Sequence, residues 1–285
     1  MTVTEQDGDL IRRSNRYYGD GAPDTGWWAD IASRPDYDSI IAGYDWAGVL
    51  AAHAGKGSIA VLDCGCGIGR FPRRLGSQVD FPEGMTLLCD TLDVSSRSLA
   101  EHRRGLRAPF IPRHSFCSAV EDFHLVPWTG SYEVIWCMHS LYTVPRERLP
   151  RVVATLASLL AAGGRCFIYL PRRQSAYMVI SGLYLRALDR SGQHQCYLTA
   201  EDVLAELASG HARQVEVVDC SFDHWVEGDL LAAYLNQACL CPDQLTLAQW
   251  RQSAAVGTYL DTAFDRGRAA WRFGQQMALI SFARC

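Results

Sequence analysis

The chain has 285 residues, of which 48% are hydrophobic and 20% are charged, and its formal net charge is −4. This composition is that of an ordinary globular protein, and the length fits one large domain or one domain with a lid. The acidic balance and the lack of a long basic run disfavour a nucleic-acid partner. No signal-like apolar core follows Met1 and no apolar run reaches about 18 residues, so we expect no membrane span and a cytoplasmic location.

The cysteines are scattered along the chain, many of them in apolar runs such as the one around Cys166. Free cysteine behaves as a small buried hydrophobe. The pairs Cys64/Cys66 and Cys239/Cys241 lack the CxxC spacing and the neighbouring histidine of a structural zinc site. We therefore expect no metal in this protein.

Residues 1–50 mix aromatic rings with glycine, proline and aspartate, a pattern that predicts short helices and turns. Rings clustered ahead of the first strand suit a lid over a flat apolar ligand, and they equally suit simple packing under an N-terminal cap. The rings that we consider as candidate substrate contacts are Tyr17, Tyr18, Trp27 and Trp28.

From residue 59 onward, short apolar runs alternate with helical patterns. The runs predict strands within 58–67, 85–95, 108–123, 131–144 and 165–173. Helices are predicted over 70–78, 95–106 with a serine cap, and 146–164 closed by Gly163 and Gly164. The arginine-rich run at 101–104 is interpreted as a solvated helix face. Strands that alternate with helices predict a parallel α/β sheet.

Beyond residue 171 the alternation is looser. Helical patterns cover 175–188, 197–209, 228–241 and 246–265, and strand patterns cover 213–226 and 272–285. Thr199, followed three residues later by Asp202, predicts a variant of the capping box at the start of one of these helices.

The stretch "VLDCGCGIGR" at 61–70 carries glycines at every second position directly after a predicted strand. Gly65, Gly67 and Gly69 allow the backbone to pass close to a ligand, but their spacing differs from the dinucleotide fingerprint. Asp63, just ahead of them, is poorly suited to a pyrophosphate and suits a cationic amine. Asp93 ends the second strand, where an acid can accept hydrogen bonds from ribose hydroxyls.

These stretches resemble, in order and spacing, the successive motifs of class I S-adenosylmethionine-dependent methyltransferases over roughly residues 55–172: "VLDCGCGIGR", "LDVS", "CSAVEDF", "EVIWCMHSLYTV" and "LLAAGGRCFIYL". The segments "MHSLYTV", "CYLTAEDVLAELA", "GDLLAAYLNQAC" and "FGQQMALISFA" resemble histamine N-methyltransferase and its relatives. The resemblance implies a Rossmann-like α/β fold with a mostly parallel seven-stranded sheet flanked by helices. It also implies an aromatic-rich lid at 1–50, and a methyltransferase domain at 51–285 with substrate-binding insertions at about 173–200 and 224–270.

The resemblance implies S-adenosylmethionine as the cofactor. Asp63, Gly65 and Gly67 would hold its methionine moiety, with Gly69 in the same turn. Asp93 would bind the ribose. The adenine would be bordered by Ala119, Val120 and Glu121, and Met138 would lie beside the sulfonium.

The resemblance also implies the substrate end of the site. His139 stands where the histamine-methylating relatives have a glutamine, and Thr143 replaces a tyrosine. The substrate-binding acid of that family maps to Asp36 or Asp38. Further positions on the pocket wall would be Tyr142, Gln195, Tyr234 and Gln276.

His139 is also a candidate by its own position. It ends the fourth strand, where catalytic groups of open α/β sheets collect, and a histidine can accept a proton near neutral pH. The alternative is a histidine packed under the following loop. Tyr142 is either a core ring or part of the pocket wall, and His224 either contacts substrate or supports the C-terminal layer.

Together these features predict a methyltransferase acting on a small nitrogen heteroaromatic molecule, of imidazole or indole and alkaloid type, at nitrogen or carbon, in specialised metabolite biosynthesis. One alternative is O-methylation of a phenol or carboxylate. Another is an inactive, methyltransferase-like binding protein, which the intact glycines and Asp63 and Asp93 disfavour. We expect a small-molecule substrate, no nucleic-acid or membrane partner, and a monomer or homodimer.

Overall fold

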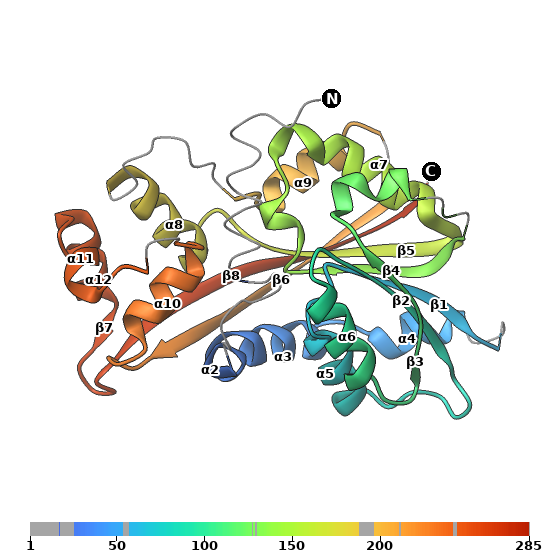
Figure 1. The fold of residues 1–285 in the computed structure, drawn as a ribbon, viewed down its shortest axis with the longest axis horizontal. Helices are drawn as coiled ribbons and strands as arrows, with labels where there is room; N and C mark the ends of the chain where they lie inside the picture. The colour runs from blue at the N-terminus through green and yellow to red at the C-terminus, as the bar shows by residue number, and fades with distance from the viewer. Residues whose placement is uncertain are drawn as a thin grey trace.

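The computed structural model describes residues 17, 26–53, 57–126, 128, 130–187, 197–210, 212–241 and 244–284. Within these residues, eight strands form one sheet in the order β3-β2-β1-β4-β5-β8-β6, with β7 paired to β8 (Figure 1). The strands are β1 (Ile59–Cys64), β2 (Leu87–Asp93), β3 (Phe110–Cys117), β4 (Tyr132–Met138), β5 (Leu160–Pro171), β6 (Ala212–Val226), β7 (Phe264–Asp265) and β8 (Ala270–Arg284).

Helices surround this sheet. The α-helices are α2 (Gly26–Trp28), α3 (Arg34–Ala42), α4 (Trp46–Ala51), α5 (Arg70–Gln78), α6 (Ser96–Gly105), α7 (Leu149–Leu159), α8 (Ala176–Ala187), α9 (Ala200–Leu207), α10 (Leu231–Ala238), α11 (Leu247–Trp250) and α12 (Ala254–Ala263). Shorter turns of helix are the π-helix η1 (Ala29–Ser33) and the 3-10 helices η3 (Val120–Leu125), η4 (Leu141–Thr143) and η5 (Arg146–Arg148).

The pairing from β3 to β5 is parallel throughout, and β8 pairs antiparallel with both β5 and β6. This confirms the predicted α/β fold with a mostly parallel seven-stranded sheet. The two-residue strand β7 is an addition at the edge of β8. The central strands β1 and β4 are buried on both faces, which is why they are largely apolar runs in the sequence.

Two hydrophobic layers cover the faces of the sheet. One contains Leu156 of α7 and Val203 of α9, and the other contains Ile40 and Trp46 of α3 and α4 together with Leu75 of α5. Figure 1 shows α7 and α9 on one side of the sheet and α3 to α6 on the other. The described part of residues 1–50 therefore contributes to the main core through α3 and α4.

A third apolar cluster lies at the far end of the long strands β6 and β8. It joins Ile180 of α8, Tyr234 of α10, Trp250 of α11 and Leu260 of α12 around Phe273 of β8. Figure 1 shows these helices gathered beyond the main sheet. They come from the two segments in which we expected substrate-binding insertions.

Two predicted helices end differently from the expectation. The helix predicted over 146–164 ends at Leu159, and the two glycines lie inside β5 instead of closing the helix. A Cβ on Gly164 would lie 2.6 Å from the backbone oxygen of Tyr132, so the glycine serves the close approach of β4 and β5. The helix predicted over 246–265 is divided into α11 and α12, because Ser253 caps a second helix.

The predicted N-terminal caps at Ser95 and Thr199 are confirmed. The Ser95 hydroxyl accepts a hydrogen bond from the Ser98 amide at 3.0 Å at the start of α6. At the start of α9, the backbone N–H and the hydroxyl of Thr199 both bond to the Asp202 carboxylate at 2.9 Å. These caps fix where each helix leaves the sheet edge.

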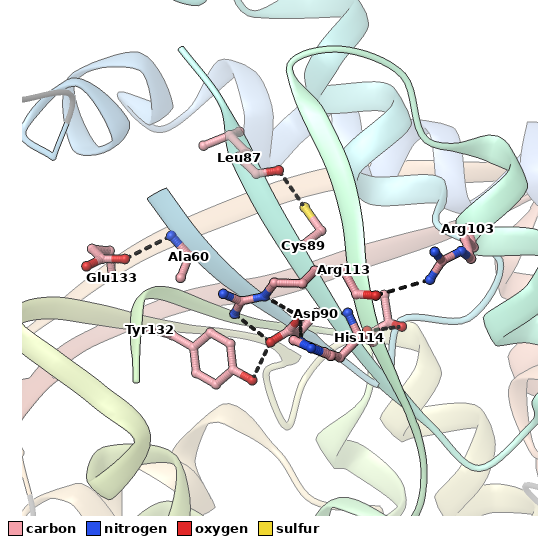
Figure 2. Close-up of polar contacts among 10 residues, drawn as sticks. Ala60, Leu87, Cys89, Asp90, Arg103, Arg113, His114, Tyr132 and Glu133 are labelled. Atoms are coloured by element: carbon pink, nitrogen blue, oxygen red, sulfur yellow. Dashed lines mark hydrogen bonds and ion pairs between the residues drawn. The ribbon is translucent and has the colours of Figure 1, made fainter. Parts of the chain in front are cut away.

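A buried carboxylate ties β2, β3 and β4 together. Asp90 accepts two bonds from the Arg113 guanidinium, at 2.8 and 2.6 Å, and one from the Tyr132 hydroxyl at 2.9 Å. Figure 2 shows these groups converging on Asp90. Burial raises the pKa of Asp90, but the bonds from Arg113 and its neighbours outweigh that effect and lower it. None of these residues lines the cavity described below, so their role is to hold the strands.

Among the described residues, no helix combines the length and apolar character that crossing a bilayer requires.

Candidate active site

A cavity of about 350 Å³ opens at the carboxyl ends of β1, β2 and β4. In open α/β sheets this edge is where ligands bind. One end of the cavity is lined by Gly65 and Gly67 of the loop after β1 and by Asp93, whereas Gly69 of the same loop does not line it. The other end is lined by aromatic rings around Asp36 and His139. We call these the cofactor end and the substrate end.

The loop after β1 is folded in a way that its glycines permit. Gly65, Gly67 and Gly69 have φ values of 66°, 48° and 80°, in the left-handed region where other residues are strained. A Cβ on Gly65 would lie 2.2 Å from the Cβ of Ser140, whereas no atom lies within 4 Å of the position at Gly67. The loop is thus pressed against the turn after β4 at Gly65 and open at Gly67.

Asp93 faces this loop from the end of β2. Its two oxygens accept one bond each, from the Gly67 amide at 2.8 Å and the Ser95 amide at 2.9 Å. Burial raises the pKa of Asp93, and these amide bonds oppose that rise. A carboxylate has about four acceptor sites, so Asp93 retains capacity for hydroxyl groups of a ligand.

Asp63 is buried beneath the same loop and contacts a residue that the sequence analysis missed. Its Oδ2 lies 2.9 Å from Nε2 of His102, which is also buried. A Cβ on Gly69 would lie 2.8 Å from the His102 ring, so the loop lies directly on that ring. The run at 101–104, interpreted as a solvated face, therefore contains one buried side chain that orients Asp63.

The remaining residues expected at the cofactor end also line the cavity. They are Ala119, Val120, Glu121 and Met138. An acid for an ammonium group, an acid for vicinal hydroxyls and an apolar edge for a base fit S-adenosylmethionine. The described residues contain no cluster of three or more His, Cys, Asp or Glu side chains that could hold a metal ion.

Asp36 is the most unusual group at the substrate end, because its side chain is charged and only 2% exposed. Its Oδ2 lies 3.0 Å from Nε2 of His139 and accepts a bond from the Tyr177 hydroxyl at 3.4 Å. Burial would raise the pKa of Asp36, but the charge and hydrogen bonds of His139 and His224 outweigh it and lower the pKa to about 2. The carboxylate is therefore ionised at neutral pH.

His139 is held in a fixed orientation at the end of β4. Its φ of 55° is in the left-handed region, and its amide donates to the Tyr169 carbonyl at 3.2 Å. Its ring packs edge-on against the Tyr169 ring at 4.8 Å. Nε2 is buried 3.0 Å from Asp36 Oδ2 without an aligned hydrogen bond, and no described residue bonds Nδ1, so Nδ1 is the nitrogen left for the cavity.

Aromatic rings form the rest of the substrate end: Tyr17, Trp28, Tyr37, Tyr142, Tyr177 and Tyr197. Tyr142 and Tyr197 pack edge-on at 5.3 Å, and Trp28 stacks on Tyr234 at 5.3 Å. Tyr37, Tyr177 and Tyr197 were not anticipated, because no local pattern distinguishes a wall ring from a core ring. Thr143 also lines the cavity.

Two sequence-based candidates lie away from the cavity. Asp38 lies outside the cavity, where it makes a two-pronged ion pair with Arg74 at 2.5 and 2.8 Å, so it cannot contact a substrate there. Gln276 is exposed on β8, and its neighbour Gln275 is the buried one. Successive side chains of a strand point to opposite faces of the sheet, so an alignment error of one residue places a side chain on the wrong face.

Other candidates lie near the cavity without lining it. His224 and Tyr234 are fully buried behind Asp36, and Trp27 packs edge-on against Trp28 at 5.6 Å. Tyr18 and Gln195 lie outside the described residues.

The comparisons with known proteins show which family this chain belongs to. A family model for a methyltransferase domain matches residues 37–209, more than half of the chain. The chain therefore belongs to the methyltransferase-domain family, and it is an S-adenosylmethionine-dependent methyltransferase. No protein of curated function matches the sequence.

Solved structures with the same fold are distant in sequence. A Bacillus halodurans protein assigned as a methyltransferase has 14% identity and a TM-score of 0.51, over 84% of this chain and 97% of its own. The YcgJ protein of Bacillus subtilis has 12% identity and a TM-score of 0.53, over 84% and 99%. The N-methyltransferase NodS of Bradyrhizobium japonicum, with S-adenosylhomocysteine bound, has 16% identity and a TM-score of 0.49, over 98% of both chains.

The tight contact at Gly65 gives a direct test of the cofactor end. We expect Gly65→Ala to weaken S-adenosylmethionine binding at least tenfold in calorimetry, because the new methyl group would displace Ser140 and the loop with it. Gly163→Ala is the matched control, since Gly163 also has a positive φ of 77° but has no atom within 4 Å of its Cβ position and lies outside the cavity. Wild-type affinity in a folded Gly65→Ala protein would contradict this site.

Proposed function

We propose that this methyltransferase acts on a small nitrogen heteroaromatic molecule of imidazole or indole type, at nitrogen or carbon, in the biosynthesis of a specialised metabolite. One observation carries the proposal. A histidine oriented by a buried carboxylate faces a cavity walled by aromatic rings, next to the loop that fits the cofactor.

The aromatic wall supports a flat substrate. Rings prefer edge-to-face and offset-stacked contacts with other rings, which a heteroaromatic molecule can make with Tyr37, Tyr142 and Tyr177. The cavity volume of about 350 Å³ is in the range of small-molecule sites and must hold both ligands. Trp28 and Tyr17 also line the cavity, and the Tyr17 hydroxyl donates to the Cys241 carbonyl at 2.6 Å, which holds that ring in place.

The chain's own residues account for the proton that a ring nitrogen or hydroxyl must lose. When bound, S-adenosylmethionine supplies an electrophilic methyl group. Asp36 Oδ2 lies 3.0 Å from Nε2 of His139, so the carboxylate favours the tautomer with its hydrogen on Nε2, which leaves the lone pair of Nδ1 for the cavity. His139 accepts the substrate proton at Nδ1, and the ionised Asp36 stabilises the imidazolium that forms.

A panel of acceptors tests this function. With labelled S-adenosylmethionine, we expect methyl transfer to imidazole or indole compounds, such as histamine, tryptophan derivatives and cyclic tryptophan-containing dipeptides. Phenols and carboxylates of equal size should react at least tenfold more slowly. Faster transfer to a phenol would replace this proposal with O-methylation, and no transfer to any acceptor despite tight cofactor binding would favour a binding protein.

Substitutions at His139 test its role as base. His139→Asn is the better knockout because asparagine tolerates the left-handed backbone, and it should lower kcat by roughly a hundred- to ten-thousand-fold, the span of a lost general base. Cofactor affinity should change less than twofold, because the imidazole contacts the substrate. Tyr44→Phe is the control, because Tyr44 packs against the core and does not line the cavity, so its kcat should not change.

His139→Gln separates two roles. If His139 only positions the substrate by a hydrogen bond, glutamine should recover much of the rate. Our account expects glutamine to remain near the asparagine level. A kcat close to wild type in His139→Asn would remove the histidine from the chemistry.

A further inference from the structure

We propose that His224 and Tyr234 are positioning residues: Tyr234 fixes the tautomer of His224, whose Nε2–H then holds the Asp36 carboxylate in line with His139. The inference deepens the proposed function and rests on it for its kinetic consequence. Neither residue lines the cavity, and both are fully buried, so neither can act on a substrate directly.

A chain of buried polar groups runs from the core to the cavity. His224 Nε2 lies 3.7 Å from Asp36 Oδ1, and its Nδ1 lies 2.9 Å from the Tyr234 hydroxyl. The Gln275 amide nitrogen lies 3.1 Å from that hydroxyl, and the Ser175 hydroxyl bonds to the Gln275 amide oxygen at 2.6 Å. The chain therefore spans β8, α10, β6, α3 and β4 before it reaches His139.

Backbone groups settle the direction of these bonds. The Tyr177 amide can only donate, and it points to Gln275 Oε1 at 3.5 Å. The Phe273 carbonyl can only accept, and it lies 3.5 Å from Gln275 Nε2. Nε2 is thus the donor to the Tyr234 oxygen.

The direction at Gln275 determines the tautomer of His224. With Gln275 donating to its oxygen, Tyr234 has one hydrogen of its own, and His224 Nδ1 is the acceptor within reach. Gln275 Nε2 also lies 3.4 Å from Nδ1, a second donor near the same atom. Neutral His224 therefore carries its hydrogen on Nε2, the nitrogen next to Asp36.

The hydrogen on His224 Nε2 faces one acceptor, Asp36 Oδ1. Asp36 Oδ1 and His224 Nε2 are both buried, and neither has a hydrogen bond to another described group. The two atoms lie 3.7 Å apart, so a small closure gives a hydrogen bond. Asp36 Oδ2 already accepts a bond from the Tyr177 hydroxyl and lies 3.0 Å from His139 Nε2, and a buried oxygen left without a donor is costly. His224 thus keeps the carboxylate from turning away from His139.

Three variants separate positioning from packing. Tyr234→Phe removes only the hydroxyl, and we expect it to lower kcat three- to tenfold while KM and cofactor affinity change less than twofold. His224→Leu removes the donor and should lower kcat ten- to hundredfold. His224→Gln retains an N–H donor. Its decrease in log kcat should be at most two thirds of the decrease seen in His224→Leu. Tyr259→Phe is the matched control, because Tyr259 packs in the same cluster with no hydrogen bond to a described residue, and kcat should not change.

Nuclear magnetic resonance gives a readout that does not depend on turnover. The ¹⁵N spectrum of His224, assigned by its loss in His224→Gln, should show a protonated Nε2 and an unprotonated Nδ1, and Tyr234→Phe should mix the two tautomers. A His224 proton on Nδ1 in the wild type, or wild-type kcat in a folded His224→Leu, would overturn the inference. If no heteroaromatic acceptor is methylated, the proposed function fails while the spectrum still tests this hydrogen-bond chain.

Discussion

The substrate end of this protein depends on the burial of one carboxylate, Asp36. A buried ionised group is unfavourable unless charge or hydrogen bonds compensate it. No guanidinium or ammonium group of the described residues contacts Asp36, and the compensation comes from His139, His224 and Tyr177. These groups belong to β4, β6 and α8, so the charge on α3 fixes the relative positions of four elements around the cavity. A base for the proposed reaction follows from that arrangement, because it directs one nitrogen of His139 to Asp36 and leaves the other for a ligand.

The cofactor end was predictable because its signals are local in the sequence. The glycines after β1 need positive φ, and Asp93 follows the next strand, so the order of the motifs specifies both position and chemistry. The substrate end gave weaker signals. Asp36 and Asp38 are two residues apart on α3, so sequence alone could not say which carboxylate turns inward. The structure assigns Asp36 to the cavity and Asp38 to Arg74.

Other features depend on contacts between segments far apart in the chain. His102 lies in a run of charged residues, and only the packing of α6 against the end of β1 buries it beside Asp63. Gln275 and Gln276 are adjacent on β8, where one residue of register decides burial. His224 and Tyr234 were anticipated near the substrate, but they lie one layer deeper, 2.9 Å from each other, with His224 Nε2 3.7 Å from Asp36.

A crystal structure with S-adenosylhomocysteine and a methyl acceptor from the active panel tests the central claim most directly. Our account predicts the acceptor's ring N–H, or other proton-losing group, within hydrogen-bond distance of His139 Nδ1, with the contact between Nε2 and Asp36 retained. An acceptor whose polar group bonds Asp36 directly, or lies beyond hydrogen-bond reach of His139, would contradict it.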